Sequence, residues 1–417
     1  MSDQDQVAFD GSIYGAVTDW ATDFDHADPD YNRRAPEIWS TLRDTCPVAH
    51  SNRYGGVWLP VTHDLVREIA YDTEHFTSRA VVVSTQVPED PAPIGGAPPI
   101  TSDPPFHHEA RRLLLPPFAP KKIEPWEPEV RTLCRDLLDR MEADARRGSL
   151  IDAAVQYAQH IPVNVIARML GFPLEDQDLF REFVHDVLEG INNDPEVRMA
   201  AFERLDAYIA AQVEDHASNP RDDLTSYLMN VELFGEKLSP DHVGGSIILL
   251  LLAGIDTTWS AIGSSLWHLA THPEDLERLV REPEVMATAI EEFLRAYAPV
   301  TMARLVAKDH DFHGCPMKVD DWVLLPFPAA NLDPAEFNDA DGFVIDRQEN
   351  RHAAFGLGIH RCLGSNLARL ELRVAIEEFI GRFPSFTLGG TNDDVQWSVG
   401  QIRGPRVLPI RVLDISR

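Results

Sequence analysis

The sequence predicts a mainly α-helical protein with small β-sheets, organised as a single domain (residues 1–417) around one long central helix. Three observations lead to this prediction. Helical periodicity dominates the middle of the chain, strand patterns are short and lie towards its flanks, and no stretch resembles an interdomain linker. With 44% hydrophobic and 25% charged residues, the chain has the composition of an ordinary globular protein with a large core.

Apolar residues at three- and four-residue spacing predict helices over residues 129–147, 155–170, 174–191, 197–216, 276–297 and 365–383. Strand patterns cover residues 57–61, 81–83, 322–326 and 407–412. Residues 88–105 contain seven prolines and Gly95-Gly96, which predicts a long irregular loop of the kind that forms lids or binding loops. Residues 1–30 are expected to form a loosely ordered N-terminal arm.

The central helix is expected from about residue 240 to residue 272. Ser239 is a good N-cap, Pro240 suits the first helical position, and Pro273 ends the pattern. At about 1.5 Å per residue this helix is roughly 45–50 Å long. Residues 247–253 are apolar on every face, so this part should run through the centre of the protein.

Gly254, Asp256, Thr257 and Thr258 directly follow that apolar stretch, where such residues are locally unfavourable. A threonine hydroxyl can also bond the carbonyl four residues back. Two interpretations are equally open on this pattern: a glycine that allows close packing beside satisfied threonines, or a groove in a buried helix where a small ligand meets an acid and an alcohol.

Charge and cysteine content exclude several classes of protein. The net charge of 37 − 67 = −30 makes nucleic acid and an anionic membrane surface poor partners. The N-terminus has no apolar signal-like stretch, and the longest apolar run, seven residues from Ile247, is too short to span a membrane. The four cysteines are far apart, which indicates neither a disulfide framework nor a zinc ribbon and places the protein in a reducing compartment, the cytoplasm.

The segment F-G-L-G-I-H-R-C-L-G, from Phe355 to Gly364, surrounds Cys362 with three glycines at the entry to a helix. Free amides and the helix dipole favour a thiolate there, which would be either a nucleophile or a metal ligand. The spacing argues against a cysteine-phosphatase loop, because His360 is displaced by one position and Arg369 comes one residue late. An inert cysteine is a poor explanation for three glycines at fixed offsets.

This loop resembles the haem-thiolate signature F-G-x-G-x-H-x-C-x-G of the cytochrome P-450 family, of the soluble bacterial monooxygenase type, at every position. Four further segments resemble family motifs in the right order, so the resemblance covers about residues 55–412. They are Asp103-Pro104-Pro105-Phe106-His107 with Arg111, Ala253-Gly254-Ile255-Asp256-Thr257, Glu292-Phe293-Leu294-Arg295, and residues 343–347 ending at Arg347. Phe106 and Glu109 stand where bacterial relatives often carry other residues.

The resemblance implies the cytochrome P-450 fold, haem b (iron protoporphyrin IX) as cofactor, and a role for each matched residue. Cys362 would be the axial iron ligand, with Phe355 shielding its sulfur. Cationic and N–H groups would hold the two haem propionates, namely His107, Arg111, Arg304 and His360. Asp256 and Thr257 would deliver protons during oxygen activation. The residues Glu292, Arg295 and Arg347 would be structural.

The resemblance also implies a monooxygenase that inserts one oxygen atom from dioxygen into a lipophilic small molecule by hydroxylation, epoxidation or dealkylation. By family position, mostly apolar residues would line the substrate site, including Leu249, Ala253, Gly254, Val300, Met302 and Ile402. Electrons would come from a ferredoxin and its reductase, guided to a monomeric protein by a basic set consisting of Arg112, Lys121, Lys122, Arg361, Arg369 and Arg373. A peroxide-driven haem enzyme and a catalytically silent haem sensor are the alternatives, and both would dispense with the Asp256–Thr257 pair.

Overall fold

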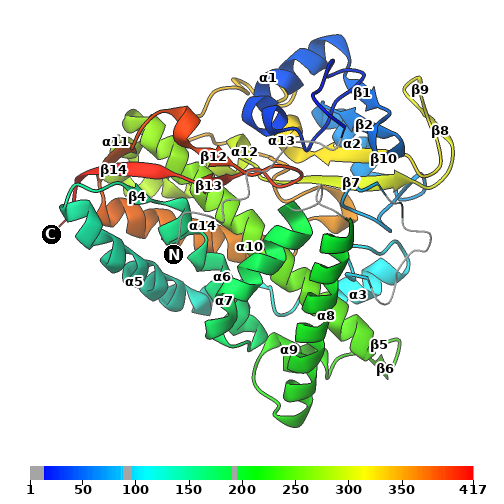
Figure 1. Cartoon of the computed structure of the whole chain (residues 1–417), viewed down its shortest axis with the longest axis horizontal. Helices are drawn as coiled ribbons and strands as arrows, with labels where there is room; N and C mark the ends of the chain where they lie inside the picture. Colours follow the sequence, from blue (N-terminus) through cyan, green and yellow to red (C-terminus); the bar gives the residue numbers. More distant parts are fainter. Residues whose placement is uncertain (1–13, 86, 88–95, 190–194, 417) are drawn as a thin grey trace.

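The computed structural model describes residues 14–85, 87, 96–189 and 195–416, and it is mainly α-helical with small β-sheets, as the sequence predicts. A helical body carries the long helix α10 through its centre, and the largest sheet lies to one side with α1 and α2 (Figure 1). The helices are α1 (Pro29–Thr45), α2 (His63–Tyr71), α3 (Phe106–Leu114), α4 (Pro120–Ile123), α5 (Glu127–Arg146), α6 (His160–Leu170), α7 (Gln177–Val184), α8 (Pro195–Ser218), α9 (Leu224–Leu228), α10 (Pro240–Thr271), α11 (Pro273–Arg281), α12 (Met286–Ala296), α13 (Phe327–Asn331) and α14 (Ser365–Arg382).

The largest sheet has five strands in the order β1-β2-β10-β7-β3, which are Val48–Ser51, Val57–Pro60, Trp322–Pro326, Thr301–Val306 and Phe76–Thr77. Strand β10 runs parallel to β2 and antiparallel to β7, where Val323 lies opposite Arg304. A three-stranded sheet joins β11 (Ser385–Leu388), β14 (Pro409–Asp414) and β4 (Ile151–Asp152). Two-stranded ladders pair β12 (Gln396–Trp397) with β13 (Pro405–Val407), β5 (Glu232–Leu233) with β6 (Glu236–Lys237), and β8 (His310–Phe312) with β9 (Cys315–Met317).

Helix α10 confirms the predicted central helix at both ends. The Ser239 side chain caps its first turn by accepting a hydrogen bond from the His242 amide, and Pro273 begins the next helix. Helix α10 packs against α6, α8 and α14, which explains why its middle is apolar on nearly every face. Among the described residues it is the one helix long and apolar enough to cross a membrane, but 61% of its most apolar window is buried inside the protein, as in a core helix.

Three predicted elements differ from the structure. The helix predicted over residues 276–297 is interrupted by a 3-10 turn at Pro283–Val285, because Pro283 has no amide hydrogen to continue the ladder. The strand predicted over residues 81–83 is not regular: Gln401 uses its side-chain amide to bond both the Val81 carbonyl and the Val83 amide. The strand predicted over residues 407–412 is divided between β13 and β14.

Of the predicted N-terminal arm, residues 1–13 lie outside the described part of the chain. The rest is packed rather than loose: Phe24 and Ala27 are fully buried, and Arg53 binds Asp23 and Asp25 in ion pairs of 2.9 and 3.1 Å. Of the predicted loop, residues 88–95 lie outside the described part. Residues 96–105 contain turns and no helix or strand, as expected.

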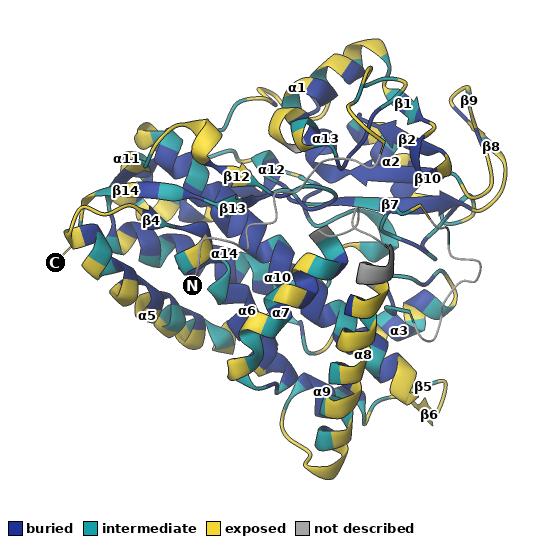
Figure 2. Ribbon diagram, viewed as in Figure 1, coloured by how far each residue is buried: buried dark blue, intermediate teal, exposed yellow. Residues whose placement is uncertain are grey.

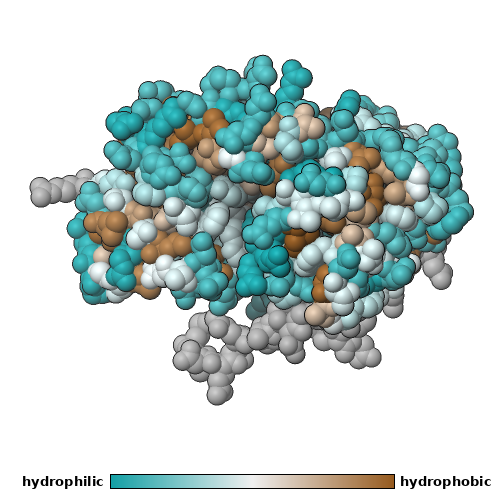
Figure 3. All heavy atoms as spheres, turned by 90° about the horizontal axis from the view of Figure 1, so that it is seen from above, coloured by the Kyte–Doolittle hydropathy of each residue, from teal (hydrophilic) through white to brown (hydrophobic). Residues whose placement is uncertain are grey.

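The buried residues form one large cluster among the helices and two smaller ones on either face of the five-stranded sheet. Figure 2 shows this burial running along α10 and the sheet, with exposed residues concentrated on α5, α8 and the loop ends. The face seen in Figure 3 is mostly hydrophilic, with apolar side chains in separated patches. The cysteine loop, residues 355–364, is half-buried to exposed and leads directly into α14.

Candidate functional site

The loop before α14 folds tightly around Cys362. Its backbone is closed by a hydrogen bond from the Cys362 amide to the Phe355 carbonyl at 2.6 Å. Gly356 and Gly358 have left-handed φ angles of 72° and 69°, which favour glycine. A Cβ atom on Gly358 would lie 2.2 Å from the Ala70 carbonyl oxygen, so the loop is pressed against the end of α2. Gly356 and Gly358 thus allow the backbone to fold tightly around Cys362, as the sequence predicts.

The Cys362 side chain has an accessible surface, although protein atoms surround it on most sides. Burial raises the pKa of its thiol, and the opposing effects of the Gly364 amide and of the Arg111 and Arg361 cations are smaller. The helix start and the nearby cations thus favour the thiolate, as expected, but burial opposes them. A raised thiol pKa disfavours a free nucleophile, whereas binding of a metal ion displaces the thiol proton directly.

Two histidines predicted to bind the same group lie against each other near this loop. The rings of His107, in α3, and His360 are 4.3 Å apart in an edge-to-face arrangement. A hydrogen bond of 2.9 Å joins the His360 Nε2 atom to the Ser78 hydroxyl. Burial and the nearby Arg111 lower the pKa of His107 to about 4, and burial with Arg304 lowers that of His360 to about 2. Both rings are therefore neutral at ordinary pH.

The two predicted arginines complete this basic group. Arg304 on β7 is 5% exposed, and burial lowers its pKa to about 10 although Asp103 opposes this effect. Its Nη1 atom donates to the carbonyl of neighbouring Ala303 at 2.7 Å. Arg111 donates to the Arg361 carbonyl, which places it beside the cysteine loop. Sequence motifs far apart in the chain are thus brought to one place.

This basic group fits a cofactor that carries two carboxylates. His107 is fully buried, and neither of its ring nitrogens has a hydrogen-bond partner among the described residues. A buried donor without an acceptor costs about 1–3 kcal/mol, so the site is incomplete without an acceptor group. Carboxylate oxygens satisfy imidazole and guanidinium donors best, and haem b carries two of them. The residues present therefore fit the cofactor that the sequence predicts.

Helix α10 has one accessible face in an otherwise buried middle section. Ala253 is exposed, and Leu249, Gly254 and Thr257 are half-buried, while their neighbours Leu252, Ile255 and Asp256 are buried. Residues 249, 253 and 257 share one helix face at four-residue spacing, so this face lines an internal space. A Cβ on Gly254 would lie 3.2 Å from an Ile166 side-chain carbon in α6, so Gly254 also serves close helix packing. Both interpretations of this segment from sequence are therefore supported.

Thr257 and Asp256 differ in their surroundings. The Thr257 hydroxyl donates to the Ala253 carbonyl at 2.9 Å, and the helix continues unbroken through this point. Asp256 is fully buried and accepts a hydrogen bond of 2.5 Å from Arg406, which comes from β13. Arg406 also donates to Ser260 at 3.0 Å, and its guanidinium lies 4.3 Å from the centroid of the Trp259 ring. Sequence reasoning missed this arginine.

The predicted structural residues form a buried ion-pair network. Arg295 binds both carboxylate oxygens of Glu292 at 2.8 Å, and both side chains are fully buried. Arg347 binds the same carboxylate at 3.0 Å. Arg295 also donates to the backbone carbonyls of Asn331, Ala340 and Gly342. This network fixes residues 331–347, which lead towards the cysteine loop.

The remaining predicted substrate residues lie on neighbouring backbone segments. Val300 and Ile402 form an isolated antiparallel bridge, and the Thr301 amide donates to the Gln401 carbonyl at 2.8 Å. Val300 and Met302 are half-buried, and Ile402 is 9% exposed. The structure thus brings Val300, Met302 and Ile402 to one place.

The predicted basic set is partly neutralised. Arg369 binds Glu291 at 2.6 Å, Arg373 binds Glu127 at 2.6 Å, and Arg112 binds Glu109 at 2.6 Å. The other members, Lys121, Lys122 and Arg361, are exposed and form no ion pair within the described part of the chain. Acids on the same and neighbouring helices therefore pair with three of the six predicted cations.

The chain is similar to known proteins over most of its length. The family model described as Cytochrome P450 matches residues 180–396. The chain is 32% identical over 379 residues to "Mycinamicin IV hydroxylase/epoxidase" of Micromonospora griseorubida, covering 89% of this chain and 94% of that protein. It is 34% identical over 314 residues to "Polyketide biosynthesis cytochrome P450 PksS" of Bacillus subtilis, covering 75% and 76%. The solved structure of CYP109E1 from Bacillus megaterium in complex with testosterone has a TM-score of 0.83 at 30% identity, covering 93% of this chain and all of that one.

Proposed function

Because the chain belongs to the cytochrome P450 family and is therefore a haem monooxygenase, we propose that its substrate is a lipophilic small molecule of the polyketide type. The observation that carries the proposal is the accessible face of α10, where Leu249 and Ala253 present apolar surface beside Thr257. Two similar proteins bear names that refer to polyketide or macrolide chemistry. The chain itself acts as one domain over residues 1–417.

When bound, the haem supplies an iron centre that activates dioxygen for insertion of one oxygen atom. Cys362 would hold the iron through its sulfur, and Phe355 packs beside its loop under the Arg369 guanidinium, whose carbon lies 4.4 Å from the ring centroid. The basic residues His107, Arg111, Arg304 and His360 would hold the two propionates. Glu292, Arg295 and Arg347 keep the preceding segment in position.

Asp256 and Thr257 hold and move protons on the other side of the site. The Thr257 hydroxyl is accessible and can accept or donate a proton through water, while its bond to the Ala253 carbonyl sets its orientation. The Arg406 guanidinium pairs with the buried Asp256 carboxyl, which gives the acid a cation and a connection towards the C-terminal strands.

Substrate binds largely by exclusion of water from apolar walls. The proposed lining consists of Leu249, Ala253, Gly254, Val300, Met302 and Ile402. Two similar proteins act on or bind large molecules of different shapes, a macrolide in one case and testosterone in the other. These two molecules are therefore the first probes to use.

A ferredoxin with its reductase supplies the electrons to a cytoplasmic, monomeric enzyme. Lys121, Lys122 and Arg361 are the exposed cations that support docking of an acidic partner. Charge reversal of Arg361 should slow reduction at low ionic strength more than reversal of Arg373, whose charge Glu127 and Glu377 already neutralise. Equal rates of reduction in the two variants would contradict the proposed docking surface.

The test of the proposed function begins with the haem absorption band of the holoenzyme. Addition of mycinamicin IV should displace water and shift the band towards the high-spin position, and testosterone should do so less. If neither compound shifts the band and fatty acids do, the proposal of a polyketide-type substrate is wrong.

The second test measures product formed per NADH consumed. Thr257→Ala should retain the spin shift and lower this ratio, with hydrogen peroxide as the other product, because proton delivery loses its hydroxyl. Thr271→Ala is the matched control, since Thr271 makes the same bond to a carbonyl four residues back at the end of α10. A Thr257→Ala variant that couples as well as the parent would contradict the assigned role.

A further inference from the structure

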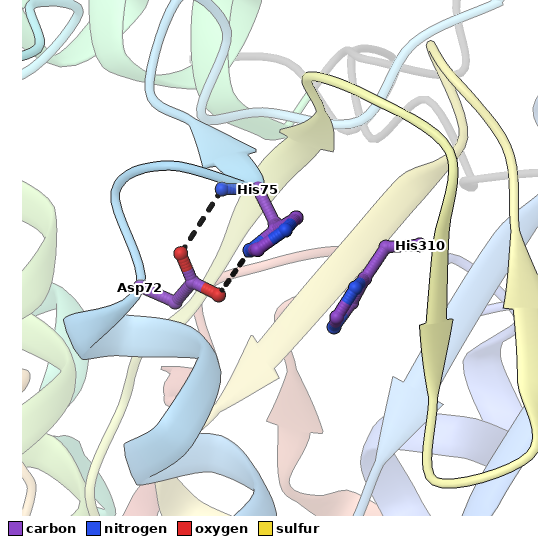
Figure 4. Close-up of side chains that lie close together, drawn as sticks. All are labelled: Asp72, His75 and His310. Atoms are coloured by element: carbon purple, nitrogen blue, oxygen red, sulfur yellow. Dashed lines mark hydrogen bonds and ion pairs between the residues drawn. The ribbon is translucent and has the colours of Figure 1, made fainter.

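Three side chains that could bind a metal ion meet at the edge of the five-stranded sheet, and none of them belongs to the residues that fit haem. Asp72 lies at the C-cap of α2, His75 follows three residues later, and His310 begins β8 (Figure 4). One donor atom from each can be chosen so that all three lie within 4.8 Å of one another. Neither the haem chemistry nor the ion-pair network described above uses any of them.

Two segments far apart in the sequence are tied together at this point. The Ala307 amide donates to the His75 carbonyl at 2.7 Å, and Phe76 lies opposite Val306 in the β3–β7 ladder. His310 lies opposite Met317 in the β8–β9 hairpin. Both histidines are therefore anchored by backbone hydrogen bonds, so their approach is fixed by the fold.

The side chains are oriented by one another. A hydrogen bond of 2.7 Å joins His75 Nδ1 to Asp72 Oδ2, and the Asp72 carboxylate also accepts from the His75 amide at 3.0 Å (Figure 4). The His75 and His310 rings stack with centroids 4.1 Å apart and an angle of 24° between their planes. Ligation of one ion by both Asp72 and His75 would replace their hydrogen bond, since the two side chains approach each other through atoms that can bind a metal.

The donor set favours a particular class of ion. The Asp72 carboxylate accepts hydrogen bonds from the backbone amides of Glu74 and His75, both at 3.0 Å, which hold it as an oxygen donor beside the two rings. His75 and Asp72 are 26% and 28% exposed, which leaves room for water on the ion. Two imidazoles and one carboxylate suit Zn²⁺, Ni²⁺ or Cu²⁺ and not the oxygen-seeking Mg²⁺ or Ca²⁺.

We propose that Asp72, His75 and His310 form a binding site for a divalent transition-metal ion, with one ring nitrogen from each histidine and one carboxylate oxygen as ligands. Water completes the coordination. The stacked rings must turn about their Cβ–Cγ bonds to point their nitrogens at one ion. Of the three ligands, Asp72 also lines an open depression of about 720 Å³ together with Glu68 and His313.

Binding at this site would stiffen the structure next to the cysteine loop. Ala70, two residues before Asp72, carries the carbonyl that Gly358 approaches. An ion held between Asp72 and His310 would join the end of α2 to the β8–β9 hairpin. We therefore expect the ion to raise the unfolding temperature of the holoenzyme, since it binds the folded state alone.

The test is calorimetric titration of untagged, chelator-treated holoenzyme with ZnCl₂. We expect one strong site per chain, and His310→Ala should weaken it at least tenfold. His75→Ala should weaken zinc binding by a similar factor. If His75→Ala folds poorly, the His310→Ala variant alone tests the site, because His310 is less embedded in the sheet than His75. The haem absorption band serves as the check on folding.

Two controls separate this site from its neighbours. His313→Ala removes a histidine from the same hairpin that pairs with Glu68 at 2.9 Å, and it should leave the zinc affinity unchanged. Cys315→Ser removes the thiol on β9 and should also have no effect. Parent-level zinc affinity in His310→Ala, or loss of affinity in either control, would overturn the assignment.

Discussion

Replacing Glu371 with glutamine should stabilise the protein in alkaline solution and leave its stability in acid nearly unchanged. Glu371 lies on α14, the helix that follows the cysteine loop, and is 2% exposed. Its Oε2 atom has no hydrogen-bond partner among the described residues. Burial raises its pKa from 4.5 to about 8, so the folded protein holds this carboxyl in its neutral form at pH 7.

The sign and size of the effect follow from the two protonation states. Between pH 4.5 and about 8 the unfolded chain releases this proton and the folded chain keeps it, so the stability of the parent falls as pH rises through this window. Above about pH 8 the loss is complete and constant. A difference of 8 − 4.5 units at about 1.4 kcal/mol per unit gives about 5 kcal/mol. Glutamine stays neutral and avoids this loss.

The measurement is the unfolding temperature of parent and variant at about pH 5, 7 and 9 and at a fixed heating rate. A change of 1 kcal/mol moves this temperature by about 2–4 °C in chains of 150–250 residues, and by roughly half as much at this length. The advantage of Glu371→Gln should therefore grow from about 1 °C at pH 5 to roughly 5–10 °C at pH 9.

Glu284→Gln, at an exposed position, is the control and should show no such trend. A difference between Glu371→Gln and the parent that is the same at every pH would refute the reasoning, because it would mean that Glu371 does not change its protonation between the two states.

Two further predictions concern the loop and the acid. Gly358→Ala should lower the haem content, measured by the ratio of haem to protein absorbance, because its Cβ would collide with the Ala70 carbonyl at 2.2 Å. Gly148 is the control, since it has a similar φ of 73° with open space around it. Gly148→Ala should reduce the stability by only about 1–2 kcal/mol, the cost of the backbone strain that alanine introduces there. Arg406→Gln should destabilise the protein by about 3–5 kcal/mol, because it removes the cation that pairs with the buried Asp256. Adding Asp256→Asn to the same chain should restore most of this loss. If thermal unfolding shows that the effects of the two substitutions are additive, the two residues do not form a direct pair.

Local signals predicted a good part of this structure. The ends of α10 follow from Ser239 and Pro273, and the cysteine loop follows from glycines whose φ angles and close contacts leave little room for other residues. Glu292 and Arg295, three residues apart on a helix, would alone indicate a surface pair, and the family resemblance rightly predicted a buried one. Pro283 carried a signal for the helix break that the apolar periodicity on either side concealed.

Pairings between distant segments could not be predicted in the same way. The cation that meets Asp256 comes from Arg406, and nothing near either residue in the sequence marks the other as its partner. The irregular backbone of residues 81–83 depends on the Gln401 side chain, which takes the place of a neighbouring strand. The ion pairs of the basic set could not be predicted either, because helix packing alone decides that Arg369 reaches Glu291 and Arg373 reaches Glu127.

The pair of Asp256 and Arg406 also constrains how the chain is made. During synthesis the acid leaves the ribosome 406 − 256 residues ahead of the arginine, a delay of roughly 8–30 s at about 5–20 residues per second. In that interval the most apolar helix of the protein carries a carboxylate that cannot be buried with its final partner. Helix α10 must then stay partly solvated or be shielded by a chaperone, and the interior can close only after nearly the whole chain has emerged.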